Sequence, residues 1–459
     1  MTGVLADEHM SDVDALVWAV EHEPRFRTTI AALAVFDETL DHARLRHCVD
    51  RASRVIPRLR QRVVPDALGI APPRWSVDPD FRLSYHLRST ELRADEQALT
   101  SLVRDVIVQP FDRSRPLWEF THITGIPGGG SALLLKAHHA VSDGVGGVEL
   151  MLELFDLAAS PDPDRAELPL PPTADAADEP LVAAIRHEVT ATITSLGNLL
   201  VAASTPRSLE AVAASSRRLG EALGSVGRMF TSSSDTSALP SARSDGLDVR
   251  FLSVPLDDLR EAGRRFDATI NDAFIGAAAM GIADHFRALD DAGAQAPLRI
   301  SVPISTRDEE AGAGNHWTLV SIELDLRRAS DVAAFCGHVR QTMRRAKDDP
   351  AQDLFAPLAA GLRRLPAVAT TSIFDSLTSG LDIAASNVPG SSVPLHLCGQ
   401  PVAAMIPFGP LSGCAVNLTL MSHAGTAHIG VSSDPAAVAD PDGLLVCIEN
   451  AFTAITKGS

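Results

Sequence analysis

Two adjacent histidines, His138 and His139, end an apolar run in the stretch LLLKAHHAVSDGVGG, residues 133–147. An imidazole with a pKa of about 6.5 is the side chain best suited to take up a proton at neutral pH. Asp143 follows His139 by four residues, and a carboxylate there can hold the bend that presents a base without touching the base itself. The pattern HHxxxDG therefore indicates a histidine general base. The simpler alternative is that both rings are buried packing residues.

The same spacing disfavours a metal site. Neighbouring side chains of a strand point to opposite faces, so adjacent histidines cannot easily bind one ion, and zinc requires three or four protein ligands. Other catalytic signatures are missing as well: the sequence contains no GxSxG elbow, no Walker A lysine, no complete GxGxxG loop and no HExxH. A histidine base without a protein nucleophile leaves that role to the substrate. The simplest such reaction is the attack of a substrate hydroxyl on an activated acyl carbon.

The elements that must position the histidines can be predicted from the flanking residues. WEFTHITG, the turn IPGGGS and ALLLKAHH (118–139) predict a β-hairpin whose second strand is apolar on both faces and therefore central. VGGVELMLELFDLAA (145–159) predicts a helix after a glycine-rich bend. The histidines thus lie at the carboxyl end of a strand, where α/β proteins often place ligands. Because side chains alternate along a strand, we expect only one histidine to face a cleft and the other to be structural.

Composition sets limits on the class of protein. The chain has 459 residues, which exceeds the size at which one core keeps growing, so two domains or one bilobal unit is expected. Hydrophobic residues make up 45% and charged residues 21%, as in soluble globular enzymes. A net charge of -18 argues against nucleic-acid binding over most of the surface. Without a signal peptide or an apolar run long enough for a membrane span, we expect a cytoplasmic protein, at most peripheral to the inner membrane face or to lipid droplets.

Short apolar runs alternate with helical patterns and predict an α/β protein. The runs include RISVPIS (299–305), LVSIELDL (319–326) and AVNLTLM (415–421), and a helical pattern is NDAFIGAAAMGIADHFRAL (271–289). Two stretches, 159–180 and 231–246, are rich in proline and acidic residues or in serine and are typical of exposed connectors. We therefore expect an N-terminal lobe over residues 1–160, a connector over 161–246 and a C-terminal lobe over 247–459. Apolar residues at helical spacing predict amphipathic helices within the connector. Their arginines either contact a lipid surface or, more simply, belong to a crossover packed on the lobes.

The stretch HHAVSDG (138–144) resembles the HHxxxDG signature of the acyl-CoA-dependent acyltransferase superfamily, which includes chloramphenicol acetyltransferases and peptide-synthetase condensation domains. The surrounding motifs are most similar to those of one branch, the bacterial wax ester synthase/diacylglycerol acyltransferase family. They cover nearly the whole chain in the family's order: MSDVDALVW (10–18), DRSRPLWEF (112–120), TINDAFIGA (269–277), SVPISTR (301–307) and AASNVPG (384–390).

The resemblance implies an α/β fold of the chloramphenicol-acetyltransferase type, with two lobes of mixed sheets and flanking helices and a tunnel between the lobes. It also implies that His139 is the catalytic base. The other motif residues would support it: His138, Asp143, Gly144 and Asn271 near the active centre, and Pro116, Leu117, Trp118 and Asp272 in the framework. Simpler interpretations stay open for some of them. Asn271 and Asp272 can cap the helix that follows, Trp118 can be ordinary core, and residues 387–390 can be only a turn.

By the same resemblance we expect an O-acyltransferase that moves a long-chain acyl group from acyl-CoA to diacylglycerol, with no metal or other cofactor and no acyl-enzyme. Its partners are then acyl-CoA, diacylglycerol or a long-chain alcohol, and a membrane or lipid-droplet surface. Three alternatives stay open: a wax ester synthase that acylates long-chain alcohols, a carrier-protein-dependent acyltransferase, which the lack of a fused carrier domain disfavours, and a lipid-binding protein that has lost its activity. Two departures bear on the acceptor, since residues 22–37 lack the family's methionine–histidine pair and His423 replaces a frequent tyrosine.

Overall fold

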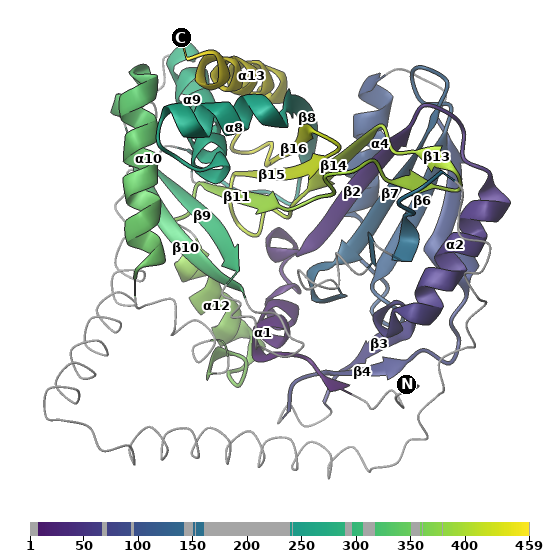
Figure 1. Ribbon diagram of the computed structural model, residues 1–459. Coiled ribbons are helices and arrows are strands. Elements are labelled where there is room, and N and C mark those ends of the chain that lie inside the picture. Colours follow the sequence, from purple (N-terminus) through teal and green to yellow (C-terminus); the bar gives the residue numbers. More distant parts are fainter. Residues whose placement is uncertain are drawn as a thin grey trace, which may run out of the picture.

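Two α/β lobes lie side by side in the computed structural model (Figure 1), which confirms the expected fold class. The structure describes residues 8–66, 71–92, 96–141, 150–159, 239–289, 296–305, 317–349 and 359–458, apart from residues 152, 241, 360 and 379. The connector helices predicted between residues 181 and 230 lie outside the described residues, as do Asp143 and Gly144.

The N-terminal lobe is built on a five-stranded sheet with the order β14-β2-β7-β6-β5. Its strands are β2 (Thr29–Phe36), β5 (Leu87–Glu91), β6 (Trp118–Thr124), β7 (Ser131–His138) and β14 (Ala404–Phe408). The predicted hairpin is confirmed, because β6 and β7 pair antiparallel and β7 lies between β6 and β2. Every residue of β7 is buried, as expected for a central strand.

Helices cover both faces of this sheet, and a small second sheet adjoins it. The helical elements of the lobe are α1 (Asp12–Val20), η1 (Pro24–Phe26), α2 (His42–Val55), η2 (Pro57–Arg60), α3 (Leu83–His86), α4 (Glu96–Val108) and η3 (His139–Val141). The small sheet has the order β1-β4-β3, with β1 (Glu8–His9), β3 (Gln61–Val64) and β4 (Arg74–Val77). Leu133 and Leu135 of β7 pack with α2, whereas Ala132 and Leu134 pack with α4, so the apolar character of both strand faces is explained.

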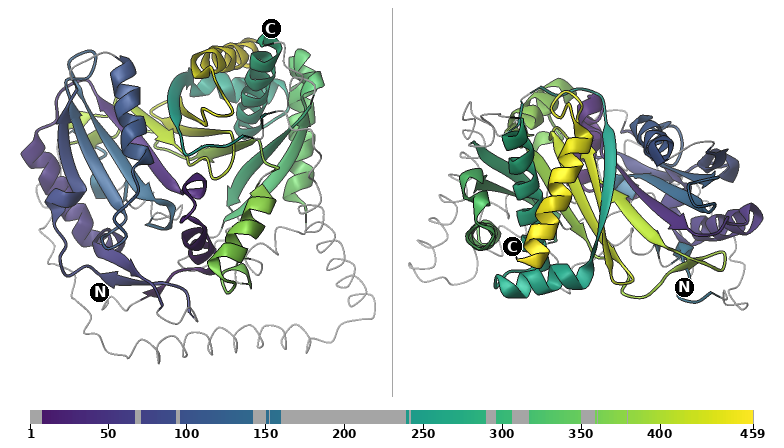
Figure 2. Two further views of the ribbon diagram at one scale, coloured as in Figure 1. Left: turned by 180° about the vertical axis from the view of Figure 1, so that it is seen from behind. Right: turned by 90° about the horizontal axis from the view of Figure 1, so that it is seen from above.

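The C-terminal lobe is built on a six-stranded mixed sheet with the order β10-β9-β11-β15-β16-β8. Its strands are β8 (Asp248–Pro255), β9 (Pro297–Ser305), β10 (Trp317–Asp325), β11 (Ile383–Val388), β15 (Val416–His423) and β16 (Thr426–Ser433). Its helical elements are α8 (Leu256–Arg265), α9 (Ile270–Ala288), η5 (Leu326–Ser330), α10 (Val332–Lys347), α12 (Ala367–Thr378) and α13 (Pro441–Lys457). The helices α8, α9, α10 and α13 gather on one side of the sheet (Figures 1 and 2) and form the largest core of the molecule with it.

One strand crosses between the lobes. Residues 404–408, which the sequence assigns to the C-terminal lobe, form β14 and pair antiparallel with β2 as an edge strand of the N-terminal sheet. The short pair β12 (His396–Leu397) and β13 (Gln400–Pro401) precedes it. On its other side β14 lies against β15 and β16 of the C-terminal sheet. A strand from the C-terminal part of the chain is therefore hydrogen-bonded into the N-terminal sheet and packs against the C-terminal sheet.

A second junction joins the lobes through α1 and α12, which lie side by side (Figures 1 and 2). Phe26 packs edge-on against Phe374 with 5.1 Å between ring centroids. Arg25 pairs with Asp375 at 3.0 Å, and Arg363 pairs with Asp12 at the start of α1. The helix that contains the opening sequence motif is thus held by the C-terminal lobe.

We predict that Gly430→Ala lowers the stability of the whole protein. A β carbon on Gly430 would lie 1.7 Å from the carbonyl oxygen of Pro407 in β14, so β14 and β16 would have to separate. We expect a loss of about 1–3 kcal/mol in the free energy of unfolding, the usual effect of forcing extra volume into a packed core. Gly337→Ala on the exposed side of α10 is the matched control, because no atom lies within 4 Å of its added carbon. Equal thermal melts for both variants would show that β14 does not pack closely on β16.

Candidate active site

The two histidines occupy different environments, but strand alternation is not the reason. β7 ends at His138, whose backbone N–H donates to the carbonyl oxygen of Leu117 at 2.9 Å. His139 already belongs to the turn η3, and its N–H donates to the carbonyl oxygen of Thr28 at 3.0 Å. The ring of His138 is buried at 1% exposure, whereas His139 is half-buried. The two histidines therefore lie in different environments because β7 ends between them, and not because side chains alternate along a strand.

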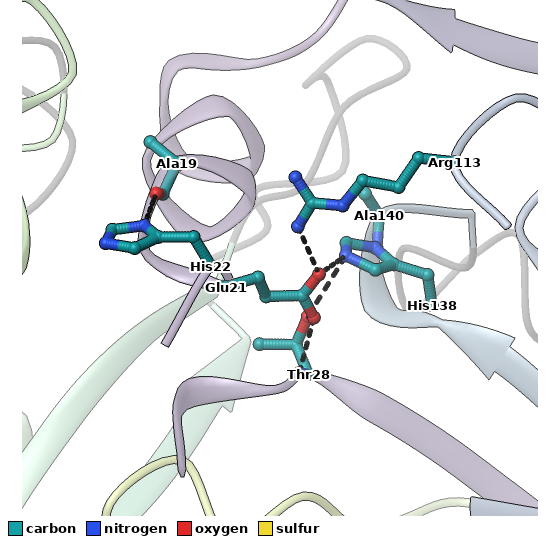
Figure 3. A network of polar contacts seen from close by, with 7 residues as sticks. All are labelled: Ala19, Glu21, His22, Thr28, Arg113, His138 and Ala140. Carbon is teal, nitrogen blue, oxygen red and sulfur yellow. Dashed lines mark hydrogen bonds and ion pairs between the residues drawn. The ribbon is translucent and has the colours of Figure 1, made fainter. Parts of the chain in front are cut away.

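A buried carboxylate holds the ring of His138 (Figure 3). Its Nε2 lies 2.9 Å from Oε2 of Glu21, the residue that follows the last turn of α1. The other oxygen, Oε1, accepts hydrogen bonds from the backbone N–H and the hydroxyl of Thr28, both at 2.7 Å. Arg113 approaches Oε2 at 3.4 Å from the loop before β6. Glu21 is thus surrounded by donors on both oxygens.

The ionisation of Glu21 follows from these contacts. Burial alone raises the pKa of its carboxyl group, but the hydrogen bond and electrostatic attraction of the His138 N–H and the two hydrogen bonds from Thr28 outweigh burial. The pKa falls from 4.5 to about 2. Glu21 is therefore a carboxylate at neutral pH.

Aromatic rings enclose the same histidine. The indole of Trp18 on α1 contacts His138 edge-on with 5.5 Å between centroids, and the guanidinium of Arg113 lies 4.0 Å from the indole centroid. Phe111 lies at 6.4 Å from the imidazole. The opening motif of the sequence and the loop before the Pro-Leu-Trp segment therefore meet at His138.

The Pro-Leu-Trp segment lies beside this strand end, and Trp118 belongs to the core. Trp118 is fully buried, its Nε1 donates to the carbonyl oxygen of Leu59 at 2.8 Å, and the ring of His86 stacks on it at 4.5 Å. The carbonyl oxygen of Leu117 accepts a hydrogen bond from the backbone N–H of His138, and the carbonyl oxygen of Pro116 accepts one from that of Trp118. The segment thus fixes the strand that carries the histidine pair.

A buried lysine lies two residues before His138 on β7. Lys136 is 0% exposed; its Nζ donates to the carbonyl oxygen of Gln109 at 2.7 Å and lies 3.4 Å from Oε2 of Glu119. Its ammonium also lies 4.4 Å from the ring centroid of Phe111. Burial lowers the pKa of Lys136, and the charge of Glu119 opposes that shift. Lys136 and Glu119 therefore anchor the end of α4 and the following loop on the sheet.

The other predicted site residues have mixed outcomes. Thr269 caps α9, and Asp272 closes a capping box with it, so the simpler interpretation holds for Asp272. Asn271 lies half-buried in the first turn of α9, and its role near the active centre stays a prediction. The Asn-Val-Pro-Gly stretch ends β11, and a β carbon on Gly390 would lie 1.7 Å from the carbonyl oxygen of Ser422, so this turn requires glycine.

The lobes meet at a cavity of about 60 Å³. It is lined by Arg27, Thr29 and Val108 from the N-terminal lobe and by Arg243, Gly413 and Asp434, among others, from the other side. Arg27 and Arg243 each donate to backbone carbonyl oxygens, those of Val108 and Gly413. A continuous tunnel between the lobes stays a prediction. Within the part of the chain that the structure describes, no group of three or more metal-binding side chains is placed to hold an ion.

Comparison with protein families decides the assignment. The family model of the wax ester synthase/diacylglycerol acyltransferase catalytic domain matches residues 10–274. The model of the C-terminal domain of the same family matches residues 313–456. The chain belongs to the wax ester synthase/diacylglycerol acyltransferase family. It is therefore an acyltransferase, and the family predicted from its motifs is confirmed.

Individual relatives extend over the whole chain. A protein of Mycobacterium tuberculosis H37Rv, provisionally named a diacylglycerol O-acyltransferase, is 32% identical over 458 residues that cover 98% of this chain and 92% of that protein. Among solved structures, the wax ester synthase/diacylglycerol acyltransferase from Marinobacter aquaeolei VT8 has a TM-score of 0.61 at 19% identity and covers 98% of this chain and 99% of that one. The first condensation domain of the CDA synthetase has a TM-score of 0.59 at 17% identity, with 99% and 96% covered. These two structures establish the chloramphenicol-acetyltransferase-like fold.

The sequence interpretation missed Glu21, Thr28 and Arg113 as neighbours of the histidine pair. A signal for Glu21 was present, because Asp14, Trp18 and Glu21 have the i, i+4, i+7 spacing of one helix face. A carboxylate on the same helix face as a buried tryptophan is itself expected to be buried, and a buried carboxylate requires a hydrogen-bonding or charged partner. No comparable local pattern identifies Thr28, whose contacts depend on how β2 and β7 pair.

Proposed function

We propose that this acyltransferase moves a long-chain acyl group from acyl-CoA to the hydroxyl of diacylglycerol, which gives triacylglycerol and free CoA. The observation that carries the proposal is the match to both family domains along a chain that holds its histidine pair at the end of a central strand. The name of the Mycobacterium tuberculosis relative supports the same acceptor. No resident metal or cofactor takes part in the proposed reaction.

The proposed mechanism uses His139 as a general base. Its imidazole takes the proton of the acceptor hydroxyl while the hydroxyl oxygen bonds to the thioester carbonyl carbon. The tetrahedral intermediate then collapses, the carbon–sulfur bond breaks, and the imidazolium returns the proton to the CoA thiolate. Asp143 and Gly144 hold the loop after the histidines in this proposal, and Asn271 lies near the active centre. The half-buried position of His139 next to a fully buried His138 supports the choice of base.

We predict triacylglycerol as the main product when palmitoyl-CoA is offered with diacylglycerol and a long-chain alcohol together. The name of the Mycobacterium tuberculosis relative supports a glycerolipid acceptor, whereas the family description names both wax ester synthesis and diacylglycerol acylation. Separation of the lipid products by chromatography measures the ratio. A mixture dominated by wax ester would show that the preferred acceptor is the long-chain alcohol, and the proposed mechanism would stay the same. Absence of CoA thiol release with every acceptor would instead favour a lipid-binding protein without activity.

We also predict reversible binding to lipid surfaces, because both proposed substrates are amphiphiles. Among the described residues, none of the helices is both long and apolar enough to cross a bilayer. Flotation with anionic liposomes measures the binding, and neutral liposomes serve as the control. A protein that stays at the bottom of the gradient with both liposomes, and that keeps full activity on dispersed lipid after deletion of residues 181–230, would contradict the prediction.

A further inference from the structure

Two hydrogen-bonded routes lead from one carboxylate to the backbone that carries His139, and the residues of the first route are drawn in Figure 3. On the first route, Glu21 Oε2 meets Nε2 of His138 at 2.9 Å, and Nδ1 of His138 accepts the backbone N–H of Ala140 at 3.0 Å. On the second route, Glu21 Oε1 accepts the N–H and the hydroxyl of Thr28, whose carbonyl oxygen accepts the N–H of His139. The backbone of residues 139 and 140 is thus tied to Glu21 from both sides.

The first route specifies the tautomer of His138. A backbone N–H can only donate, so the N–H of Ala140 requires a lone pair on Nδ1 of His138. A neutral ring then carries its proton on Nε2, where the carboxylate of Glu21 accepts it. If the proton moved to Nδ1, Ala140 would lose its acceptor and the turn η3 would lose a hydrogen bond beside His139. The charge of Glu21 opposes that change, because its pKa of about 2 keeps it ionised.

We propose that Glu21 is a positioning residue for acyl transfer: its carboxylate holds His138 in the Nε2-protonated tautomer and Thr28 in place, and through them fixes the turn that presents His139. This inference rests on the proposed function of His139 as the base. It assigns to the first histidine of the pair a defined task, which is to accept the N–H of Ala140. A displacement of about 1 Å at a catalytic group is enough to slow a reaction by about 10²-fold.

The informative change is Glu21→Gln, which keeps the shape of the side chain. The side chain of glutamine has one carbonyl oxygen and one NH₂ group. It can therefore accept hydrogen bonds from Thr28 only by turning its NH₂ toward His138. The NH₂ then needs a lone pair on Nε2, and the ring proton must move to Nδ1, where it faces the N–H of Ala140. We expect the turnover number to fall by about 10- to 100-fold, with the Michaelis constant for acyl-CoA within about twofold of wild type, because no substrate contact is removed.

Glu119→Gln is the matched control. Glu119 is also buried, and it pairs with Lys136 two residues before His138, but its contacts do not lead to residues 139 and 140. A merely structural role for Glu21 predicts that both variants lose stability and that neither changes turnover beyond its effect on the folded fraction. Positioning predicts that only Glu21→Gln lowers the turnover of the folded protein. Glu21→Asp keeps the charge at a shorter reach, and we expect it to recover part of the turnover lost in Glu21→Gln.

A second measurement is independent of activity. Nitrogen-15 chemical shifts of protein labelled at histidine report which ring nitrogen carries the proton, and comparison with His138→Gln identifies the signals of His138. We expect the proton on Nε2 in wild type and on Nδ1 in Glu21→Gln. A proton on Nδ1 in wild type, or full turnover in Glu21→Gln, would each overturn the inference. Failure of wild type to release CoA would instead refute the proposed function, while the tautomer in wild type and in Glu21→Gln would still be read from the spectra.

Discussion

His139→Ala is expected to lower the rate of CoA release by about 10² to 10⁴-fold, the usual contribution of a general base. The protein should keep nearly the same melting temperature, because the ring is only half-buried and the hydrogen bond to Thr28 comes from the backbone of residue 139, which the substitution keeps. Thiol release at saturating acyl-CoA and a thermal melt on the purified variant measure the two quantities.

The comparison with His138→Ala makes the test specific. This substitution removes a fully buried ring from Glu21 and from the N–H of Ala140, so it should reduce stability and yield. The protein that folds should keep a measurable fraction of its activity. If His138→Ala were inactive yet as stable as wild type while His139→Ala turned over normally, the two roles would have to be exchanged.

Lys136→Met is expected to destabilise the N-terminal lobe by about 3–5 kcal/mol, the cost of leaving one member of a buried ion pair alone. The substitution removes the hydrogen bond to Gln109, and among the described residues it leaves Glu119 paired with Arg88 at 3.8 Å, whose side chain is 46% exposed. Because Met has about the length of the lysine stem, the packing against Phe111 should change little. Urea unfolding of the purified variant measures the loss.

A double variant separates charge burial from packing. Lys136→Met combined with Glu119→Gln removes both charges, so it should be more stable than Lys136→Met alone. Arg88→Gln is the control for the exposed partner and should have a small effect, since the Arg88 side chain is exposed and its distance of 3.8 Å from Glu119 is long. A double variant less stable than either single variant would show that the two side chains stabilise the lobe independently, without a cost from the unpaired charge of Glu119.

Local patterns predicted the elements around the site well. The apolar run of β7 and the glycines of the preceding turn predicted the hairpin, and Gly125, Gly128 and Gly129 indeed have positive φ. The expected strands at β9, β10 and β15 and the helix α9 are also present. Each of these elements is specified by hydrophobic periodicity over neighbouring residues, which is the part of folding that a single sequence displays.

What the sequence could not predict depends on pairing between distant segments. The end of β7 at His138 follows from its register with β2, which brings the carbonyl oxygen of Thr28 to the N–H of His139. The partnership of His138 with Glu21 joins residues 117 positions apart. In both cases the residues lack a shared local pattern, and the contact exists only after the sheet and α1 have assembled.

The crossover strand has a consequence for how this chain can be divided. Without β14, the N-terminal sheet would present the free edge of β2, a row of unpaired backbone groups that invites pairing with another molecule. Recombination between relatives at the connector would therefore exchange part of the N-terminal sheet along with the C-terminal lobe. The residue pairs between Ala31–Val35 and β14 must then match across parental sequences. A chimera that exchanges one lobe alone would therefore disturb the N-terminal sheet, so the unit that can be exchanged between relatives is the whole chain.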